Sequence, residues 1–289
     1  MSNKTGGGKA TANTNIHNQE DTSMNDTMND FSFGSGFQFS GATIDNLEAS
    51  EYTLVTIALD ESGSISGFES QIEDMLKAAV GACFSSPYSN NLLIRVIRFG
   101  SQYKHQNGNG VDEIHGFKPL SEIDVNAYPN LRGGGATPLN DGVYSSVGAM
   151  NQYAESLVDL DFAVNGITFV ISDGGENASV ATAKMVKDEL KKSVTGEVME
   201  SHLSILIGIN IVTDDMRKRN PTYAKQIEAK VEQDLENFQR DAGMSQFIWA
   251  GEATKSKLAK LAEFVSQSIS STSQALGTGG PSQNISATI

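Results

Sequence analysis

Four near-continuous apolar runs, separated by stretches with helical spacing, restrict the fold of this chain more than any other feature. The runs are residues 53–59, 92–99, 167–172 and 203–209. Strands without polar alternation are typical of sheets that are buried on both faces. Because strands that alternate with helices are joined by right-handed crossovers, we expect an α/β fold with a doubly wound, mostly parallel sheet and helices on both faces.

Helical spacing of apolar residues predicts the helices that accompany these strands. We expect them over residues 68–84, 139–157, 180–194, 223–238 and 258–269. The stretch from Ser66 to Glu69 matches a capping box at the start of the first helix, and Pro138 suits the first turn of the second. Shorter strands are expected at 113–117, on a sheet edge, and at 247–250.

The composition divides the chain into a folded region and two polar tails. Residues 1–45 are rich in Asn, Gly, Ser and Thr, so we expect a disordered N-terminal tail. The folded domain is expected over residues 51–270, and a flexible C-terminal tail over 271–289. Alternating phenylalanines within 31–39 form a Phe-rich patch that would add a strand to a sheet edge or dock on a partner; an idle linker is the alternative.

Charge and hydropathy exclude two classes of partner. The net charge is −14, and residues 51–210 carry 20 acidic and 10 basic side chains. A field of this sign repels phosphate backbones, so no nucleic-acid partner is expected. No apolar run is long enough for a membrane span, and the first residues lack the apolar core of a signal peptide. With a single cysteine, Cys83, in an apolar helical pattern, these features predict a cytoplasmic protein.

Oxygen-bearing side chains follow two predicted strands and precede one predicted helix. Asp60, Ser62 and Ser64 alternate after the first apolar run. Asp173 follows the third run, and Thr137 precedes a helix. Ligands bind beyond the carboxyl ends of the strands in doubly wound sheets, so we expect these side chains to converge. Carboxylates and hydroxyls without His or Cys favour Mg²⁺, or Mn²⁺ or Ca²⁺, over zinc.

Each of these residues also has a simpler role when it is taken alone. Serines stabilise turns, a threonine before a helix acts as an N-cap, and Asp-Gly is a common turn. The neighbouring Glu61 and Glu176 are expected to be solvated loop charges. The histidines show no ligand spacing and are assigned no role.

The complete set resembles the metal-ion-dependent adhesion site of von Willebrand factor A (VWA) domains. That family carries D-x-S-x-S, a downstream Thr and a downstream Asp. The corresponding segments here are DESGS at 60–64, Thr137 in GGGATP and Asp173 in SDGGEN. The resemblance covers about residues 51–270 and implies the Rossmann-like VWA fold. The Ser-rich stretch FVSQSISSTSQ is similar to an intracellular bacterial or phage branch of the family that is linked to tellurite resistance and stress response.

The resemblance also implies a role for each site residue. Ser62 and Ser64 would bind the metal directly, Asp60 and Asp173 would act through water, and Thr137 would bind directly or through water. An open coordination position would then take an acidic residue of a protein partner.

Three functions compete for this set of residues. The first is a metal-dependent protein-binding module within a larger assembly, and not an enzyme, because no nucleophile or general base accompanies the five side chains. The second is a metal-dependent phosphotransferase, which typically carries a second carboxylate where this chain has Ser62. The third is a structural subunit of a filament, shell or virus particle, with tails that drive homo- or hetero-oligomeric assembly.

Overall fold

The sheet contains eight strands in the order β1-β2-β5-β4-β3-β6-β7-β8. This computed structural model describes residues 28–34, 36–195, 198–210, 212, 214–252 and 254–278. The strands are β1 (Met28–Phe33), β2 (Phe37–Ala42), β3 (Glu51–Asp60), β4 (Leu92–Phe99), β5 (Val111–Pro119), β6 (Ala163–Ser172), β7 (Ser201–Asn210) and β8 (Gln246–Glu252). β3 pairs in parallel with both β4 and β6, and β7 and β8 continue in parallel, whereas β1–β2 and β4–β5 are antiparallel. The predicted doubly wound, mostly parallel sheet is confirmed, and the strand order reverses between β3 and β6.

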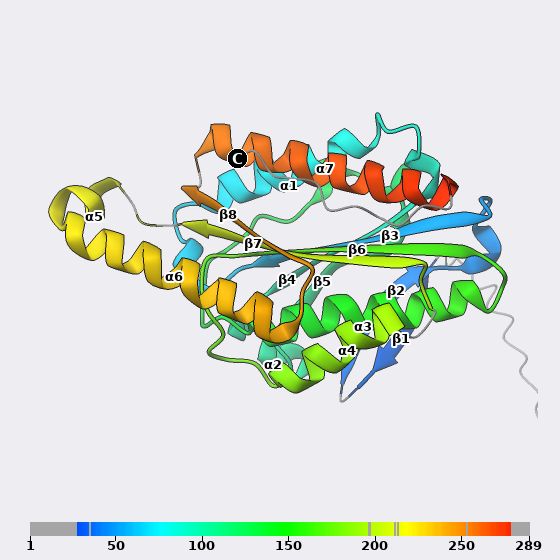
Figure 1. Ribbon diagram of the computed structural model, residues 1–289, viewed down its shortest axis with the longest axis horizontal. Coiled ribbons are helices and arrows are strands. Elements are labelled where there is room, and N and C mark those ends of the chain that lie inside the picture. Colours follow the sequence, from blue (N-terminus) through cyan, green and yellow to red (C-terminus); the bar gives the residue numbers. More distant parts are fainter. Residues whose placement is uncertain are drawn as a thin grey trace, which may run out of the picture.

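Helices cover both faces of the sheet, as Figure 1 shows. One face carries α1 (Glu69–Cys83) and α7 (Lys255–Thr278). The other carries α3 (Leu139–Val158), α4 (Ala183–Thr195) and α6 (Pro221–Ala242). Two short helices, α2 (Lys104–Asn107) and α5 (Asp214–Arg219), lie in connections. This is an α/β architecture consistent with the Rossmann-like VWA fold.

The central strand β3 explains why the apolar runs lack polar alternation. Val55 and Ile57 pack into the core formed with α1 and α7. Ala58 packs into the core on the α3 side, and Leu54 joins an adjoining cluster on that side. Because successive side chains of a strand point to opposite faces, both faces of β3 must be apolar when both are covered.

Two local expectations about the elements are wrong. α1 begins at Glu69 without a capping box: the Ser66 hydroxyl donates to the Gly63 carbonyl at 2.8 Å, and the Glu69 carboxylate accepts the Gly67 N–H at 2.7 Å. The strand expected at 113–117 is not an edge strand, because β5 lies between β2 and β4. β2, from the Phe-rich patch, pairs beyond it.

β1 and β2 come from the segment that was expected to be disordered. Residues 28–42 form the β1–β2 hairpin, and Phe37 and Phe39 are buried, so the boundary expected at residue 45 is wrong. β2 reaches β5 closely at Gly116, where a Cβ would lie 2.0 Å from the Ser40 carbonyl oxygen. The interpretation of the Phe-rich patch as strand-forming is confirmed. Residues 1–27 lie outside the described part of the chain.

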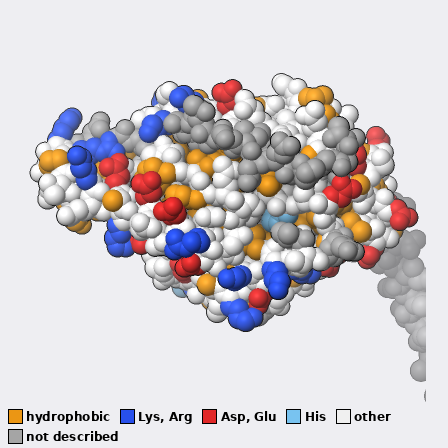
Figure 2. All heavy atoms as spheres, in the orientation of Figure 1, with side chains coloured by type: hydrophobic (Ala, Val, Ile, Leu, Met, Phe, Trp, Pro, Cys, Tyr) orange, Lys and Arg blue, Asp and Glu red, His pale blue; other side chains and the backbone are white. Residues whose placement is uncertain are grey.

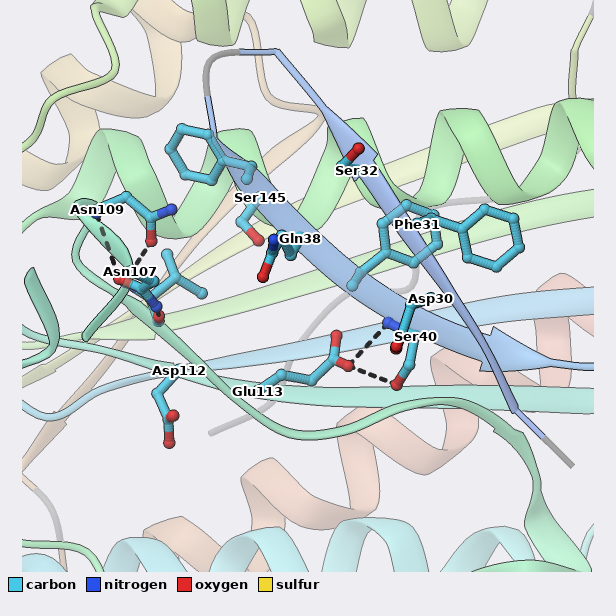
Figure 3. Close-up of a pocket in the computed structure, with 13 residues that line it drawn as sticks. Asp30, Phe31, Ser32, Gln38, Ser40, Asn107, Asn109, Asp112, Glu113 and Ser145 are labelled. Carbon is cyan, nitrogen blue, oxygen red and sulfur yellow. Dashed lines mark hydrogen bonds between the residues drawn. The ribbon is translucent and has the colours of Figure 1, made fainter. Parts of the chain in front are cut away.

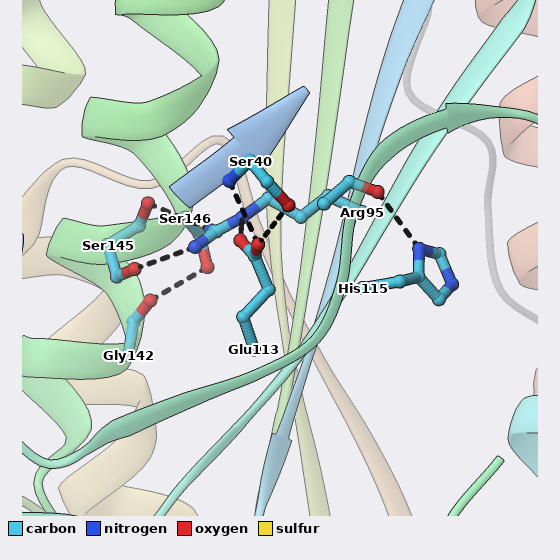
Figure 4. Close-up of polar contacts among 8 residues, drawn as sticks. Ser40, Arg95, Glu113, His115, Gly142, Ser145 and Ser146 are labelled. Carbon is cyan, nitrogen blue, oxygen red and sulfur yellow. Dashed lines mark hydrogen bonds and ion pairs between the residues drawn. The ribbon is translucent and has the colours of Figure 1, made fainter. Parts of the chain in front are cut away.

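An ion pair between the buried Arg95 and the half-buried Glu113 ties this hairpin to the rest of the domain (Figure 4). The Arg95 Nε atom lies 2.6 Å from a Glu113 carboxylate oxygen, and the other oxygen accepts the Ser40 N–H at 2.9 Å and hydroxyl at 2.7 Å. Arg95 also donates to the Ser145 carbonyl on α3 at 3.1 Å. Breaking such a pair would leave an uncompensated charge, so these contacts hold β2, β4, β5 and α3 together.

The hairpin also walls a cavity of about 500 Å³, shown in Figure 3. Phe31, Gln38 and Ser40 line it from the hairpin, and Asp112 and Glu113 from β5. None of the five candidate metal ligands lines this cavity. It is therefore separate from the predicted site.

The remaining expectations concern the C-terminal boundary, Cys83 and membranes. α7 continues to Thr278, past the boundary expected at residue 270, and residues 279–289 lie outside the described part. Cys83 is buried in the α1 core, as expected. None of the described helices is both long and apolar enough to cross a membrane.

Candidate metal site

The candidate site lies where the strand order reverses. Asp60 is the last residue of β3, and Ser172 is the last residue of the neighbouring β6, directly before Asp173. The two strands pair in register, with Leu59 opposite Ile171, so both aspartates leave the sheet at the same edge. Convergence of the carboxylates at this switch point agrees with the position expected for ligands of doubly wound sheets.

Hydrogen bonds connect four of the five predicted residues. The Ser62 N–H donates to Asp60 Oδ1 at 2.9 Å, and the hydroxyls of Ser62 and Ser64 lie 3.0 Å apart. The Ser64 hydroxyl donates to Asp173 Oδ1 at 2.9 Å across 109 positions of the sequence. These side chains therefore form one oxygen cluster.

Thr137 joins the cluster through the loop that follows Asp173. Its N–H donates to Asn177 Oδ1 at 2.8 Å, and its carbonyl accepts the Asn177 N–H at 3.1 Å. Its hydroxyl lies 3.5 Å from the position that a Cβ would take on Gly174. The five predicted residues thus lie on the end of β3 and on three adjoining loops.

Burial makes the ionisation of the two carboxyl groups energetically costly. Asp60 and Asp173 are each 2% exposed. Burial raises the pKa of Asp60 to about 6, opposed by hydrogen bonds from Ser172 and Ser62. Burial and the nearby Asp60 charge raise the pKa of Asp173 to about 7. Two buried carboxylates without a cation disfavour each other's ionisation.

The cluster fits a hard divalent cation. Asp173 Oδ2 is buried and has no hydrogen-bond partner, although its sister oxygen is bonded to Ser64. A buried carboxylate oxygen without a partner is costly unless a cation or water satisfies it. No group of three or more His, Cys, Asp or Glu side chains suited to a metal occurs in the described ranges. The donors available here are carboxylate and hydroxyl oxygens, which suit hard cations.

Glu61 is buried, which contradicts the expectation of a solvated charge. It is 1% exposed, and its carboxylate accepts hydrogen bonds from the Tyr103 hydroxyl and the Arg132 N–H. Arg98 lies 3.4 Å from it. Its carbonyl accepts the Gly134 N–H at 3.1 Å. Glu61 therefore joins the Asp60–Ser64 loop to the glycine loop that precedes Thr137.

The glycine loop approaches its neighbours too closely for a larger residue. Gly135 has φ +70°, and a Cβ on it would lie 2.3 Å from the Ser101 hydroxyl. Its carbonyl accepts the Gly63 N–H at 3.0 Å. Glycine adopts this conformation without strain, so the glycine at position 135 has a structural cause.

Glu176 is also more than a solvated charge, because it caps α3 from another loop. Its carboxylate accepts the Asn140 N–H at 2.6 Å and the Ser179 N–H at 2.7 Å. The Ser179 hydroxyl accepts the Asp141 N–H at 3.0 Å. The first N–H groups of a helix need such acceptors, and here they are supplied by the loop that carries Asp173. Sequence reasoning missed this role because Glu176 is 36 positions from Asn140, and Ser179 is 38 positions from Asp141.

Comparison with known proteins gives a likeness of fold. No protein-family model matches the sequence, and no curated protein matches it. The open conformation of the pilus adhesin SpaC from Lactobacillus rhamnosus GG superposes with a TM-score of 0.54 at 10% identity, covering 84% of this chain and 34% of that one.

Proximal thread matrix protein 1 from the mussel byssus superposes less well. One crystal form gives a TM-score of 0.46 at 17% identity, covering 77% of this chain and 49% of that one. A structure of the same protein with a zinc-occupied MIDAS motif gives 0.43 at 15% identity, covering 76% and 46%. The chain spans about a third to a half of the length of these structures. The SpaC likeness supports the α/β fold.

Proposed function

We propose that this chain is a divalent-metal-dependent protein-binding module. Ser62, Ser64 and Thr137 would supply hydroxyl oxygens to the ion, and Asp60 and Asp173 would hold it through their carboxylates. The bound ion would supply an open coordination position for a carboxylate of the partner. Mg²⁺ is the first candidate, with Mn²⁺ and Ca²⁺ as alternatives, because all three favour oxygen ligands.

The partnerless Oδ2 atom of Asp173 carries this proposal. Two buried carboxylates whose pKa values are raised to about 6 and 7 are unfavourable in an empty site near neutral pH. A divalent cation removes that cost. The hydroxyls are neutral donors, so the ion would keep its affinity for a further carboxylate oxygen at an open coordination position.

We propose binding rather than catalysis. The side chain two positions after Asp60 is a Ser62 hydroxyl, which is hydrogen-bonded within the site, rather than the second carboxylate of a phosphotransferase. Residues 1–27 and 279–289 lie outside the described ranges, so assembly through them stays a prediction that is compatible with this proposal. The cytoplasmic location and the link to stress response also stay predictions.

Calorimetric titration with Mg²⁺ tests the metal site. We expect binding to the wild type and its loss in Asp60→Ala and Asp173→Ala, because each variant removes a carboxylate from the cluster. Asp159→Ala removes an exposed carboxylate after α3 and is the matched control, which should bind as the wild type does. Unchanged binding in both site variants would contradict the proposal.

Peptide binding tests whether the bound metal coordinates a carboxylate of the partner. A labelled Gly/Ser peptide with a single aspartate should bind the wild type only with Mg²⁺, and the same peptide with asparagine should bind more weakly. EDTA should abolish the difference. Aspartate-dependent binding that persists in EDTA would show that the acidic group is not held by the metal.

A further inference from the structure

A projecting arm stands beside the metal-site edge of the sheet. It comprises α5 and the first half of α6, residues 214–230, and extends beyond the ends of the strands at the left of Figure 1. Just beyond the arm, α6 meets the loop that follows Asp173: the Cβ atom of Asp234 lies 3.5 Å from the position that a Cβ would take on Gly175. A helix rises about 1.5 Å per residue, so Pro221 lies roughly 20 Å farther along α6.

Polar contacts fix the direction of the arm. The Glu228 carboxylate accepts a hydrogen bond from Asn210, the last residue of β7, and pairs with Arg217 Nη2 at 2.9 Å. The Asn220 side chain accepts the Tyr223 N–H at 3.1 Å and caps α6. β7 pairs with β6, the strand that leads to Asp173. The arm is therefore held in one orientation relative to the metal site.

The arm has the opposite charge to the chain as a whole. Residues 214–230 contain five basic and three acidic side chains, a net charge of +2, whereas the whole chain carries −14. Lys218 and Lys225 are exposed and make no ion pair with the described part of the chain. Figure 2 shows Lys and Arg side chains gathered at this end of the molecule. Tyr223, 52% exposed, adds an aromatic surface.

We propose that the arm is a second contact for the acidic protein partner, an inference that rests on the proposed function. The partner would place one carboxylate at the metal and a further acidic stretch along the arm, against Lys218 and Lys225; Lys225 lies about 14 Å from Asp234 along α6. The acidic body of the domain disfavours a nucleic acid, whose phosphates would extend over it as well. The two contacts are rigidly spaced, so together they bind more tightly than either alone.

The test uses two designed peptides. Each carries one aspartate, a flexible Gly/Ser spacer that can span about 20 Å, and a terminal block of either glutamates or glutamines. With Mg²⁺ at low salt, we expect the wild type to bind the glutamate peptide about tenfold more tightly than the glutamine peptide. The double variant Lys218→Glu/Lys225→Glu should lose this preference and keep its Mg²⁺ affinity.

A matched double variant controls for net charge. Lys187→Glu/Lys191→Glu makes the same change on exposed positions of α4 and should keep the preference. Equal losses in both double variants, or no preference in the wild type, would overturn the role of the arm even if the single-aspartate peptide still binds with Mg²⁺. If Asp60→Ala keeps full aspartate-dependent binding, the proposed function is wrong. The preference for the glutamate peptide over the glutamine peptide still tests the role of the arm separately.

Discussion

Asp173 combines two unequal oxygen environments in one side chain. Oδ1 accepts a hydrogen bond from Ser64, whereas Oδ2 is buried without a partner. The same carboxyl lies close enough to Asp60 for that charge to raise its pKa. Such a residue costs stability in the metal-free protein and becomes favourable only when a cation binds. A loss of stability that is recovered when the ion binds is expected of a site that has been selected for binding rather than for stability.

The first prediction follows from the sign of this pKa shift. An unfolded Asp has a pKa of about 3.9, so the metal-free folded state binds protons more tightly than the unfolded chain. The stability contributed by these protons is present in acid and is lost as the pH rises through about 6 to 7. At about pH 8 without metal, Asp173→Asn should therefore be more stable than the wild type by about 1–3 kcal/mol in urea unfolding.

The comparison is made between variant and wild type because other groups titrate with the opposite sign. Burial lowers the pKa of His115 and His202 to about 4, so their contribution is lost in acid. The stability difference between Asp173→Asn and wild type should shrink below about pH 5 and reverse when Mg²⁺ is added at pH 8. An equal or lower stability of the metal-free variant at pH 8 would contradict this account.

At the scale of elements, the loop after β6 and the start of α3 form one unit. Glu176, Asn177 and Ser179 supply acceptors to the first N–H groups around Thr137 and Asp141. The Asp141 carboxylate returns the contact by accepting the N–H groups of Val180 and Ala181. The position of Thr137 relative to Asp173 is therefore set by these caps.

The second prediction tests this coupling. Glu176→Ala should destabilise the protein by about 1–2 kcal/mol, because several N–H groups lose their acceptor. It should also weaken Mg²⁺ binding severalfold, because the two loops are no longer held together. Glu176→Gln keeps an oxygen acceptor and should show smaller losses in both measurements. If Glu176→Ala leaves calorimetric Mg²⁺ binding intact, the cap does not position the site.

The sequence predicted the local elements well and the distant contacts poorly. β4 has the predicted bounds of 92–99, because a buried strand is marked by its own apolar residues. The five site residues could be chosen from their order and from their places after predicted strands or, for Thr137, before a predicted helix. The burial of Glu61 could not be predicted, because one of its hydrogen-bond donors is the backbone N–H of Arg132, which is 71 positions away. Such contacts depend on how loops meet, which no local pattern records.

At the scale of the whole molecule, the β1–β2 hairpin is part of the folded domain. Phe39 is 3% exposed, stacks on Phe31 with ring centroids 4.8 Å apart, and packs edge-on to Phe117 at 6.2 Å. The Asn-, Gly-, Ser- and Thr-rich composition of residues 1–45 favoured disorder, whereas the alternating phenylalanines within 31–39 indicated a strand. Its partner β5 lies more than 70 positions along the chain.

The third prediction measures what the hairpin contributes. Phe39→Ala should lower the free energy of unfolding by about 3–5 kcal/mol, because it opens a cavity between the hairpin and β5. Phe84→Ala makes the same change at a residue that is 46% exposed and should cost much less. Urea unfolding curves of both variants give the comparison. Equal, small effects would mean that the hairpin is dispensable to the fold.

The most direct test of the metal site is a crystal structure of the protein grown with Mn²⁺, with the anomalous difference map used to locate the ion. We predict one strong peak between the side chains of Ser62, Ser64 and Thr137, beside the carboxylates of Asp60 and Asp173. Asp173 Oδ2 should then lie within reach of the ion or of a water bound to it. An ordered site with no peak there, or a peak held by other residues, would contradict the account.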